Sequence, residues 1–146
     1  VEIHSMPGER PAVSPDVGVD LSLSYSGDHL ALALSRQGPI GIDIETIRPI
    51  PEWPGLTRNW RAEDRQAVAR AVNPARAFLR GWTAREAILK TFGHGLERLG
   101  DLDCVAIPAV GASGAPARLK TPLGNVFLTR YETETLTVAT CHANIG

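Results

Sequence analysis

The chain has 146 residues, a length typical of one domain that is large enough to bury a hydrophobic core. Its 15 Lys and Arg residues balance 16 Asp and Glu residues, and the formal net charge of -1 excludes a nucleic-acid-binding protein held by bulk positive charge. No apolar run approaches the roughly 18 residues that cross a bilayer, and the two cysteines form no CxxC pair, so we expect a protein of the reducing cytoplasm without a membrane segment or a disulfide framework.

The first part of the chain is expected to form strands joined by tight turns. Prolines and a Pro-Gly pair predict a short strand followed by a loop over residues 1–20. Residues 21–35 predict a β-hairpin, because leucines and a tyrosine alternate with small residues and Ser26-Gly27-Asp28 supplies turn chemistry. A Gly-Pro turn then leads into a predicted strand over residues 40–45.

Two helices are predicted in the middle of the chain. Three prolines indicate a loop over residues 48–54. A first helix is predicted over residues 59–72 with Asn59 as its cap, and a second over residues 74–92, which begins with a proline suited to a first turn. The remaining segments are predicted to be strands at 103–107, 117–120, 125–131 and 136–142, with a loop of small residues at 111–116.

The predicted strand over residues 40–45 carries two carboxylates on one face. Asp43 and Glu45 alternate with Ile42 and Ile44, so the carboxylates point to one side and the isoleucines to the other. Adjacent like charges on one strand face repel each other, and a bound cation between them removes that cost. The alternative interpretation is a charged sheet face in contact with solvent.

The second predicted helix adds a carboxylate within its apolar side. Its apolar residues fall on one stripe at about 100° per residue, and Glu86 lies in that stripe. A buried carboxylate requires a partner or a metal, and Lys90, one turn later, can form a simple helix ion pair with it. Taken with Asp43 and Glu45, Glu86 instead indicates a Mg²⁺ site with three carboxylates, beside a lysine that can contact phosphate oxygens.

Two motifs resemble those of the 4′-phosphopantetheinyl transferases, specifically the Sfp-like type. Gly41-Ile42-Asp43-Ile44-Glu45 is similar to the family strand G-[IV]-D-x-E. Residues 82–90, Trp-Thr-Ala-Arg-Glu-Ala-Ile-Leu-Lys, are similar to the family helix W-x-x-K-E-x-x-x-K. Further similar segments lie at residues 8–11, 21–28 and 93–96, so the resemblance covers nearly the whole chain.

The resemblance implies an α+β fold of the 4′-phosphopantetheinyl transferase type, with an antiparallel sheet packed against a long helix. Sfp-like enzymes have two similar half-domains with coenzyme A between them. Within a single transferase domain over residues 1–146, residues 1–38 would then be a remnant of the first half-domain and residues 39–146 the second. We therefore expect a piece of a longer protein, such as a domain of a polyketide or fatty-acid synthase, or a site completed by another subunit of a homo-oligomer.

The implied activity is Mg²⁺-dependent transfer of the 4′-phosphopantetheine group of coenzyme A to a serine of an apo acyl or peptidyl carrier protein, with release of 3′,5′-ADP. Asp43, Glu45 and Glu86 would bind the Mg²⁺ that bridges the pyrophosphate. Glu86 would also be the general base, and Lys90 would bind pyrophosphate oxygens and stabilise negative charge. The implied coenzyme A-binding residues are Arg10, Ser24, Tyr25, Asp43, Arg85 and Lys90.

Two positions depart from the family motifs. Tyr25 stands in place of a histidine, so it offers the 3′-phosphate of the coenzyme a neutral hydroxyl, and weaker binding is expected unless Arg10 compensates. Arg85 stands in place of a lysine, which keeps the charge and changes the geometry. Two other functions stay open: a degenerate, non-catalytic structural domain of a synthase, and a metal-dependent hydrolase of nucleotide pyrophosphates.

Overall fold

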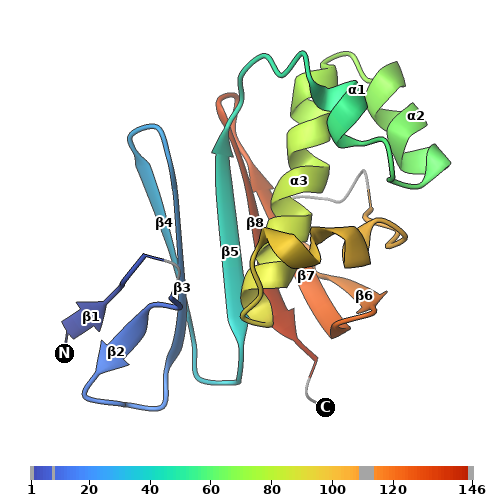
Figure 1. Cartoon of the computed structure of the whole chain (residues 1–146). Helices are drawn as coiled ribbons and strands as arrows, with labels where there is room; N and C mark the ends of the chain where they lie inside the picture. Colours follow the sequence, from blue (N-terminus) through green and yellow to red (C-terminus); the bar gives the residue numbers. More distant parts are fainter. Residues whose placement is uncertain (1, 8, 109–113, 145–146) are drawn as a thin grey trace.

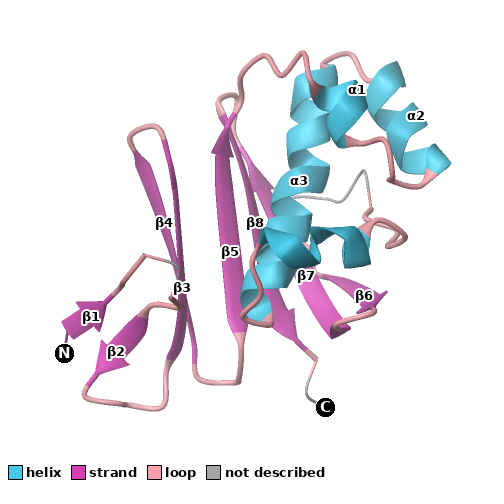
Figure 2. Ribbon diagram, viewed as in Figure 1, coloured by secondary structure: helices cyan, strands magenta, loops and turns pink. Residues whose placement is uncertain are grey.

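A computed structural model describes residues 2–7, 9–108 and 114–144. Two small antiparallel hairpins lie beside a four-stranded antiparallel sheet, and helices cover the face of that sheet (Figure 1). Coloured by secondary structure, the chain divides into an all-strand side and a side of mixed strands and helices (Figure 2). The expected mixture of antiparallel sheet and helix is confirmed. Among the described residues, no helix has both the length and the apolar character of a bilayer-spanning segment.

The N-terminal part consists of two hairpins. Strand β1 (Glu2–His4) pairs with β2 (Ala12–Ser14), in a region where only one strand followed by a loop was predicted. Strand β3 (Asp20–Ser26) pairs with β4 (His29–Ser35), as the alternation of leucines predicts. The turn between β3 and β4 places Gly27 at a φ of 58°, a conformation that favours glycine.

The four-stranded sheet has the order β5-β8-β7-β6. It consists of β5 (Ile40–Thr46), β6 (Ala117–Thr121), β7 (Gly124–Glu132) and β8 (Leu136–Ala143), which confirms four predicted strands. Strand β5 lies at one edge of this sheet and pairs with β8. Its other edge therefore has N–H groups that need acceptors from outside the sheet.

Serine side chains of β3 supply those acceptors. Serine occupies every second position of the strand, so the three hydroxyls point to one side. A hydroxyl can accept one hydrogen bond and donate another, and buried N–H groups are rarely left without a partner. The N–H groups of Ile42, Ile44 and Thr46 donate to the hydroxyls of Ser22, Ser24 and Ser26 at 3.1, 3.1 and 3.0 Å, respectively.

Three α-helices follow β5. Helix α1 (Trp53–Leu56) falls partly in the segment predicted as loop; its first turn contains Pro54, and the Thr57 hydroxyl donates to the carbonyl of Trp53 at 3.0 Å. Helix α2 (Ala62–Arg70) is shorter than predicted, since Arg61 rather than Asn59 precedes it. Helix α3 (Pro74–Thr91) begins where the sequence predicts, and the side chain of its cap, Asn73, accepts from the N–H of Arg76 at 3.0 Å.

The strand predicted over residues 103–107 is wrong. A 3-10 helix, η1 (Leu96–Leu102), precedes this segment. Residues 103–107 then continue without pairing to the sheet. Val105 and Ile107 are buried, and the N–H of Val105 donates to the carbonyl of Leu102 at 3.1 Å. Their apolar spacing reflects burial in the core rather than a strand. Residues 111–113 of the predicted loop, and Gly8 of the N-terminal motif, lie outside the described residues.

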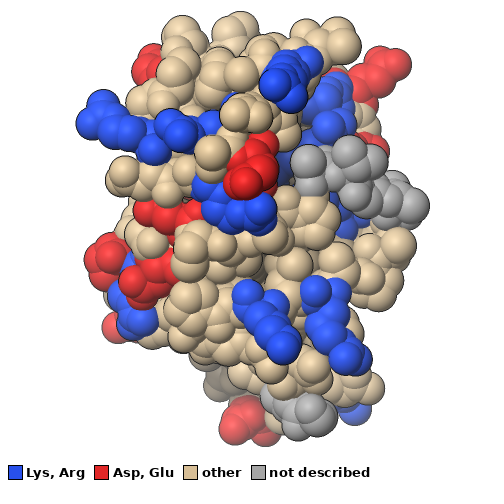
Figure 3. Space-filling model, turned by 90° about the vertical axis from the view of Figure 1, so that its right-hand side faces the viewer, with Lys and Arg blue, Asp and Glu red and all other residues tan. Residues whose placement is uncertain are grey.

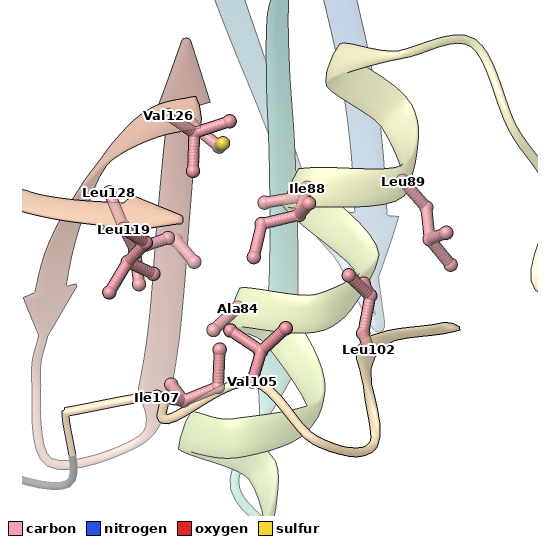
Figure 4. Packing of buried hydrophobic residues seen from close by; sticks show 12 residues of the cluster. Ala84, Ile88, Leu89, Leu102, Val105, Ile107, Leu119, Val126 and Leu128 are labelled. Carbon is pink, nitrogen blue, oxygen red and sulfur yellow. The ribbon is translucent and has the colours of Figure 1, made fainter. Parts of the chain in front are cut away.

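The main core lies between helix α3 and the four-stranded sheet. Figure 4 shows Ala84 and Ile88 of the helix facing Leu119 and Leu128 of the sheet. The segment after η1 covers the same core with Leu102, Val105 and Ile107. A second cluster, formed by Trp60, Val68, Phe78 and Leu79, joins helix α2 to the first half of α3. Helix α3 is therefore packed on several sides, and few of its positions tolerate a change of volume.

Strand β5 and helix α3 approach most closely at Gly41. A Cβ atom at this position would lie 2.1 Å from the carbonyl oxygen of Ala87 and 2.6 Å from the amide nitrogen of Thr91. Both are backbone atoms, which cannot rotate away as a side chain does. Only a residue without a side chain allows the helix to lie this close to the strand.

We expect Gly41→Ala to lower the free energy of unfolding by about 3 kcal/mol, because the helix backbone must shift to make room. Urea denaturation measures this loss. Gly55→Ala is the matched control: nothing lies within 4 Å of a Cβ at Gly55, so its effect should stay within about 1 kcal/mol. Equal stabilities of the two variants would contradict the close approach at Gly41.

Candidate functional site

Asp43 is a buried carboxylate in the middle of β5. Its side chain is 4% exposed, although carboxylates are seldom buried without partners. The hydroxyl of Ser24 donates to its Oδ1 at 3.0 Å, and the ammonium of Lys90 donates to the same oxygen at 3.1 Å. Among the described residues Oδ2 is buried and accepts no hydrogen bond. One carboxylate oxygen is thus fixed in place, and the other can take a further proton or cation.

Lys90 joins this carboxylate to two strands. Besides contacting Asp43, its Nζ donates to the carbonyl oxygen of Ile42 at 3.0 Å and to that of Leu23 at 3.3 Å. The three N–H bonds of the ammonium thus have three acceptors, one on β3 and two on β5. Lys90 forms its ion pair with Asp43. The structure therefore does not support the alternative of a simple Glu86–Lys90 ion pair on the helix.

Glu86 lies one helical turn before Lys90 and is half-buried. The pKa of its carboxyl is raised from 4.5 to about 7, first by burial and then by the negative charge of Asp43, while the positive charge of Lys90 opposes the shift. Burial also raises the pKa of Asp43, against the opposing effect of Lys90. Two carboxyl groups this close together in partly buried surroundings repel each other when both are charged. Binding of a proton or a cation between them is therefore favourable.

Glu45 lies on the same face of β5 as Asp43, as the alternation of the strand predicts. The guanidinium of Arg48 donates to its Oε2 at 2.8 Å, and the hydroxyl of Ser26 lies 3.4 Å from the same oxygen. Asp43 and Glu45 each bind a cationic side chain in this way. Within the part of the chain that the structure describes, no three His, Cys, Asp or Glu side chains form a ready-made group of metal ligands.

A cavity of about 500 Å³ opens beside Lys90. Tyr25, Arg10 and His94 line it, together with Ser22, Leu23 and residues of the N-terminal loop. Arg10 is bound to Asp20 and to the carbonyls of Ile40 and Lys90, so it ties the N-terminal loop to the end of α3. The side chain of Tyr25 points away from the core, and the residue is 79% exposed. Lys90 connects this cavity with the Asp43 carboxylate.

The structure brings six of the eight predicted site residues together; of the other two, Glu45 is paired with Arg48 and Arg85 lies outside the group. Arg10, Tyr25 and Lys90 line the cavity, while Ser24, Asp43 and Glu86 lie at the adjoining carboxylate group. Arg85 points elsewhere: its side chain is 1% exposed and its guanidinium lies 3.7 Å from the centre of the Trp60 ring. Consecutive helical residues differ by about 100° in direction, and in this structure Arg85 faces Trp60 while Glu86 faces the Asp43 side of the helix.

Sequence reasoning missed two contributors to this geometry. Ser22 and Ser26 hold β3 against β5, although neither touches the Asp43 carboxylate. The signal was the regular spacing of serines at every second residue of a strand, a residue type that strands otherwise use sparingly.

The chain is similar to proteins of one family. A family model described as the 4′-phosphopantetheinyl transferase superfamily matches residues 39–141. The 4′-phosphopantetheinyl transferase AcpT of Salmonella typhi is 36% identical over 107 residues, which are 71% of this chain and 56% of that protein. AcpT of Escherichia coli K12 is 40% identical over 87 residues, 58% of this chain and 45% of that protein.

A more distant relative is the 4′-phosphopantetheinyl transferase HetI of Nostoc sp. PCC 7120. It is 29% identical over 117 residues, which are 78% of this chain and 46% of that protein. The chain thus spans about half the length of the relatives it matches.

We expect Glu86→Gln to stabilise the metal-free protein at pH 8 and to leave its stability near pH 4.5 almost unchanged. The pKa of Glu86 is about 7 in the folded protein against an ordinary 4.5, so the folded state binds the proton more tightly and stability falls as pH rises through this range. Glutamine carries no charge to lose. Allowing for solvent screening of a half-buried group, the melting temperature should rise by about 2–4 °C at pH 8.

Thermal unfolding followed by circular dichroism at the two pH values measures this difference. Glu134→Gln, at an exposed position in the loop before β8, is the matched control and should behave like the unchanged protein at both pH values. A gain in stability that is the same at pH 4.5 and pH 8 would contradict the raised pKa of Glu86.

Proposed function

Because the chain belongs to the 4′-phosphopantetheinyl transferase superfamily, we propose that it transfers the 4′-phosphopantetheine group of coenzyme A to a serine hydroxyl of an apo carrier protein. The observation that supports this proposal is the grouping of Asp43, Glu86 and Lys90 next to a cavity of about 500 Å³. Such a cavity can take part of a coenzyme molecule, and the ammonium of Lys90 gives its wall a positive charge that favours a phosphate.

In the proposed reaction, the serine oxygen attacks the phosphorus that carries the pantetheine arm. A new oxygen–phosphorus bond forms, the bond to the second phosphate breaks, and its electron pair leaves on 3′,5′-ADP. Glu86 accepts the serine proton, for which a pKa of about 7 suits a base working near neutral pH. The three N–H bonds of Lys90 already have acceptors within the protein, so Lys90 stabilises the negative charge on the phosphate oxygens through its positive charge.

We also propose a Mg²⁺ site at the carboxylates next to Lys90. Asp43 has a buried oxygen without a hydrogen-bond partner among the described residues, and the Glu86 carboxyl next to it has its pKa raised partly by the charge of Asp43. Asp43, Glu45 and Glu86 would hold the ion, since Mg²⁺ prefers carboxylate and phosphate oxygens. When bound, the ion would neutralise the charge that develops on the leaving phosphate.

The coenzyme contacts we propose are Arg10, Ser24, Tyr25, Asp43 and Lys90; Arg85 is left out because it points away from this group. Arg10 already binds Asp20 and two carbonyl groups, which leaves it few donors for a phosphate. The neutral hydroxyl of Tyr25 does not replace a positive charge. We therefore propose that this chain holds the 3′-phosphate of coenzyme A more weakly than a histidine-containing relative.

We further propose an Sfp-like arrangement, with residues 1–38 as a remnant of a first half-domain and residues 39–146 as the second. The family match begins at residue 39, which supports this division. Strand β4 exposes Leu30 and Leu34 by 68% and 57%, and Leu32 beside them is also exposed. This apolar row supports the proposal that a further half-domain, or a second copy of the chain, packs here and completes the coenzyme site.

We expect Asp43→Ala and Glu86→Gln each to lower the transfer rate by about 100-fold or more, because each removes a carboxylate from the reacting group. The assay mixes the chain with coenzyme A, Mg²⁺ and an apo carrier protein, and mass spectrometry counts carriers that gain one phosphopantetheine. Glu134→Gln, on the exposed loop, should react like the unchanged chain. Near-normal transfer by either site variant would contradict the assignment.

The same assay separates the two other functions. A non-catalytic domain would modify no carrier under conditions in which a known transferase modifies it. A pyrophosphate hydrolase would cleave coenzyme A when the carrier protein is left out. Either result from the unchanged chain would overturn the proposed transfer.

We expect Mg²⁺ to raise the melting temperature of the unchanged chain, and to do so much less in Asp43→Ala. An ion that binds only the folded state stabilises it by mass action, and a concentration tenfold above the dissociation constant should add about 3 °C. Thermal unfolding with and without MgCl₂, at constant ionic strength, measures the difference. An equal rise in both proteins would show that Mg²⁺ acts elsewhere on the molecule.

A further inference from the structure

A second cavity, of about 210 Å³, lies between helices α2 and α3 and strand β7. Its charged lining residues are Asp64, Arg80, Arg85 and Arg130, and Trp60 and small apolar residues complete its wall. Figure 3 shows the side of the molecule that carries the helices, where acidic and basic side chains lie directly beside each other. Neither Asp43 nor Lys90 lines this cavity, so it is separate from the proposed coenzyme site.

Arg85 is held rigidly in the wall of this cavity. Its guanidinium stacks 3.7 Å from the centre of the Trp60 ring, and its Nη1 donates to the carbonyl of Gly81 at 3.0 Å. Gly81 leaves room for this stack, since a Cβ there would lie 2.8 Å from the Trp60 ring. The side chain is thus fixed in one orientation by contacts on two sides.

Most donors of this guanidinium are unused. Nε and Nη2 are buried and make no hydrogen bond among the described residues, and the side chain is only 1% exposed. Nη2 lies 3.8 Å from Oδ2 of Asp64, an ion-pair distance that is too long for a hydrogen bond. A planar fork of buried donors without acceptors is unfavourable alone and matches the geometry of an oxyanion.

Asp64 is the opposite case, a hydrogen-bond acceptor without a donor in the part of the chain that the structure describes. Its Oδ2 is buried and also lacks a hydrogen-bond partner among the described residues, so it is an acceptor that requires a donor. Burial raises the pKa of this carboxyl, while the charges of Arg61 and Arg85 oppose the shift. A ligand that lies beside this pair and contacts both residues must therefore accept hydrogen bonds from Arg85 and donate one to Asp64.

The charges around the cavity favour a negative ligand. The pKa of Arg85 is lowered to about 10 by burial, with Asp64 and Asp103 opposing and the positive charge of Arg130 adding to the shift. The pKa of Arg130 is lowered to about 10 by burial and by the charge of Arg80, against Glu132. Arg80 is itself paired with Glu132 at 2.7 Å. An anion among these arginines relieves their mutual repulsion.

We propose that this cavity binds an oxyanion that carries its own hydroxyl, of which hydrogenphosphate is the simplest. Two of its oxygens accept from Nε and Nη2 of Arg85, and its hydroxyl donates to Oδ2 of Asp64. Sulfate has no proton at neutral pH, so one of its oxygens would face the Asp64 carboxylate without a hydrogen. The cavity therefore selects phosphate over sulfate, and this selection is independent of the proposed transferase reaction.

Isothermal titration of the full chain with inorganic phosphate, and separately with sulfate, at pH 7.5 and constant ionic strength tests the proposal. We expect phosphate to bind at least about tenfold more tightly than sulfate, the value of one charge-assisted hydrogen bond. Arg85→Lys keeps the charge but loses the fork, and phosphate affinity should fall about tenfold. Asp64→Asn can donate to either anion, and the preference for phosphate should fall to within about threefold.

Two controls locate the binding event. Lys90→Met removes the phosphate contact of the proposed coenzyme site, so phosphate binding that survives in it belongs to the second cavity. Arg98→Met removes an exposed arginine that is paired with Asp101 outside this cavity, and should bind like the unchanged chain. If Arg85→Lys fails to fold, Asp64→Asn decides the question through its loss of selectivity.

The proposal is overturned if the unchanged chain binds no phosphate, or binds phosphate and sulfate equally. It is also overturned if Lys90→Met, shown by circular dichroism to be folded, binds no phosphate, or if Asp64→Asn keeps the full preference for phosphate. Failure of the transferase assay would leave these results unaffected, because none of them uses coenzyme A or a carrier protein.

Discussion

The candidate site depends on how the open edge of strand β5 finds its hydrogen-bond acceptors. Serine hydroxyls of β3 accept from the N–H groups of β5, and they hold the two sheets side by side. Ser24 does more than its neighbours, because it accepts from Ile44 and donates to Asp43. The contact that joins the sheets therefore also orients the buried carboxylate. Gly41, by admitting helix α3 close to β5, brings Lys90 across to the same place.

This arrangement concentrates unfavourable electrostatic free energy at the candidate site. Asp43 and Glu86 are two carboxyl groups in partly buried surroundings, and Lys90 supplies one positive charge against them. A core of apolar residues at the same positions would be more stable, and perturbed carboxyl groups of this kind are concentrated at functional sites. The remainder of the fold, above all the packing of helix α3 on the sheet, supplies the stability that keeps these groups together.

Local patterns in the sequence predicted the sheet and the long helix well. Alternating leucines gave the β3–β4 hairpin, and the Asn73-Pro74 pair gave the start of α3, because both signals act within a few residues. The strand over residues 103–107 failed, since alternating apolar residues also suit a segment that packs over a core. The sequence motif also did not predict where the Arg85 side chain points. Its partner Trp60 is 25 residues away in sequence, and only tertiary packing brings the two together.

Arg85 and Glu86 are neighbours in sequence but belong to different sides of helix α3. The helix thus carries two separate sets of polar contacts, whose directions are fixed relative to each other by the helical geometry. Inserting or deleting one residue between Gly81 and Arg85 would turn the preceding part of the helix by about 100° against the rest. Gly81 would then no longer face Trp60 while Arg85 stacks on it. In evolution, the length of this stretch of the helix is therefore constrained as well as its side chains.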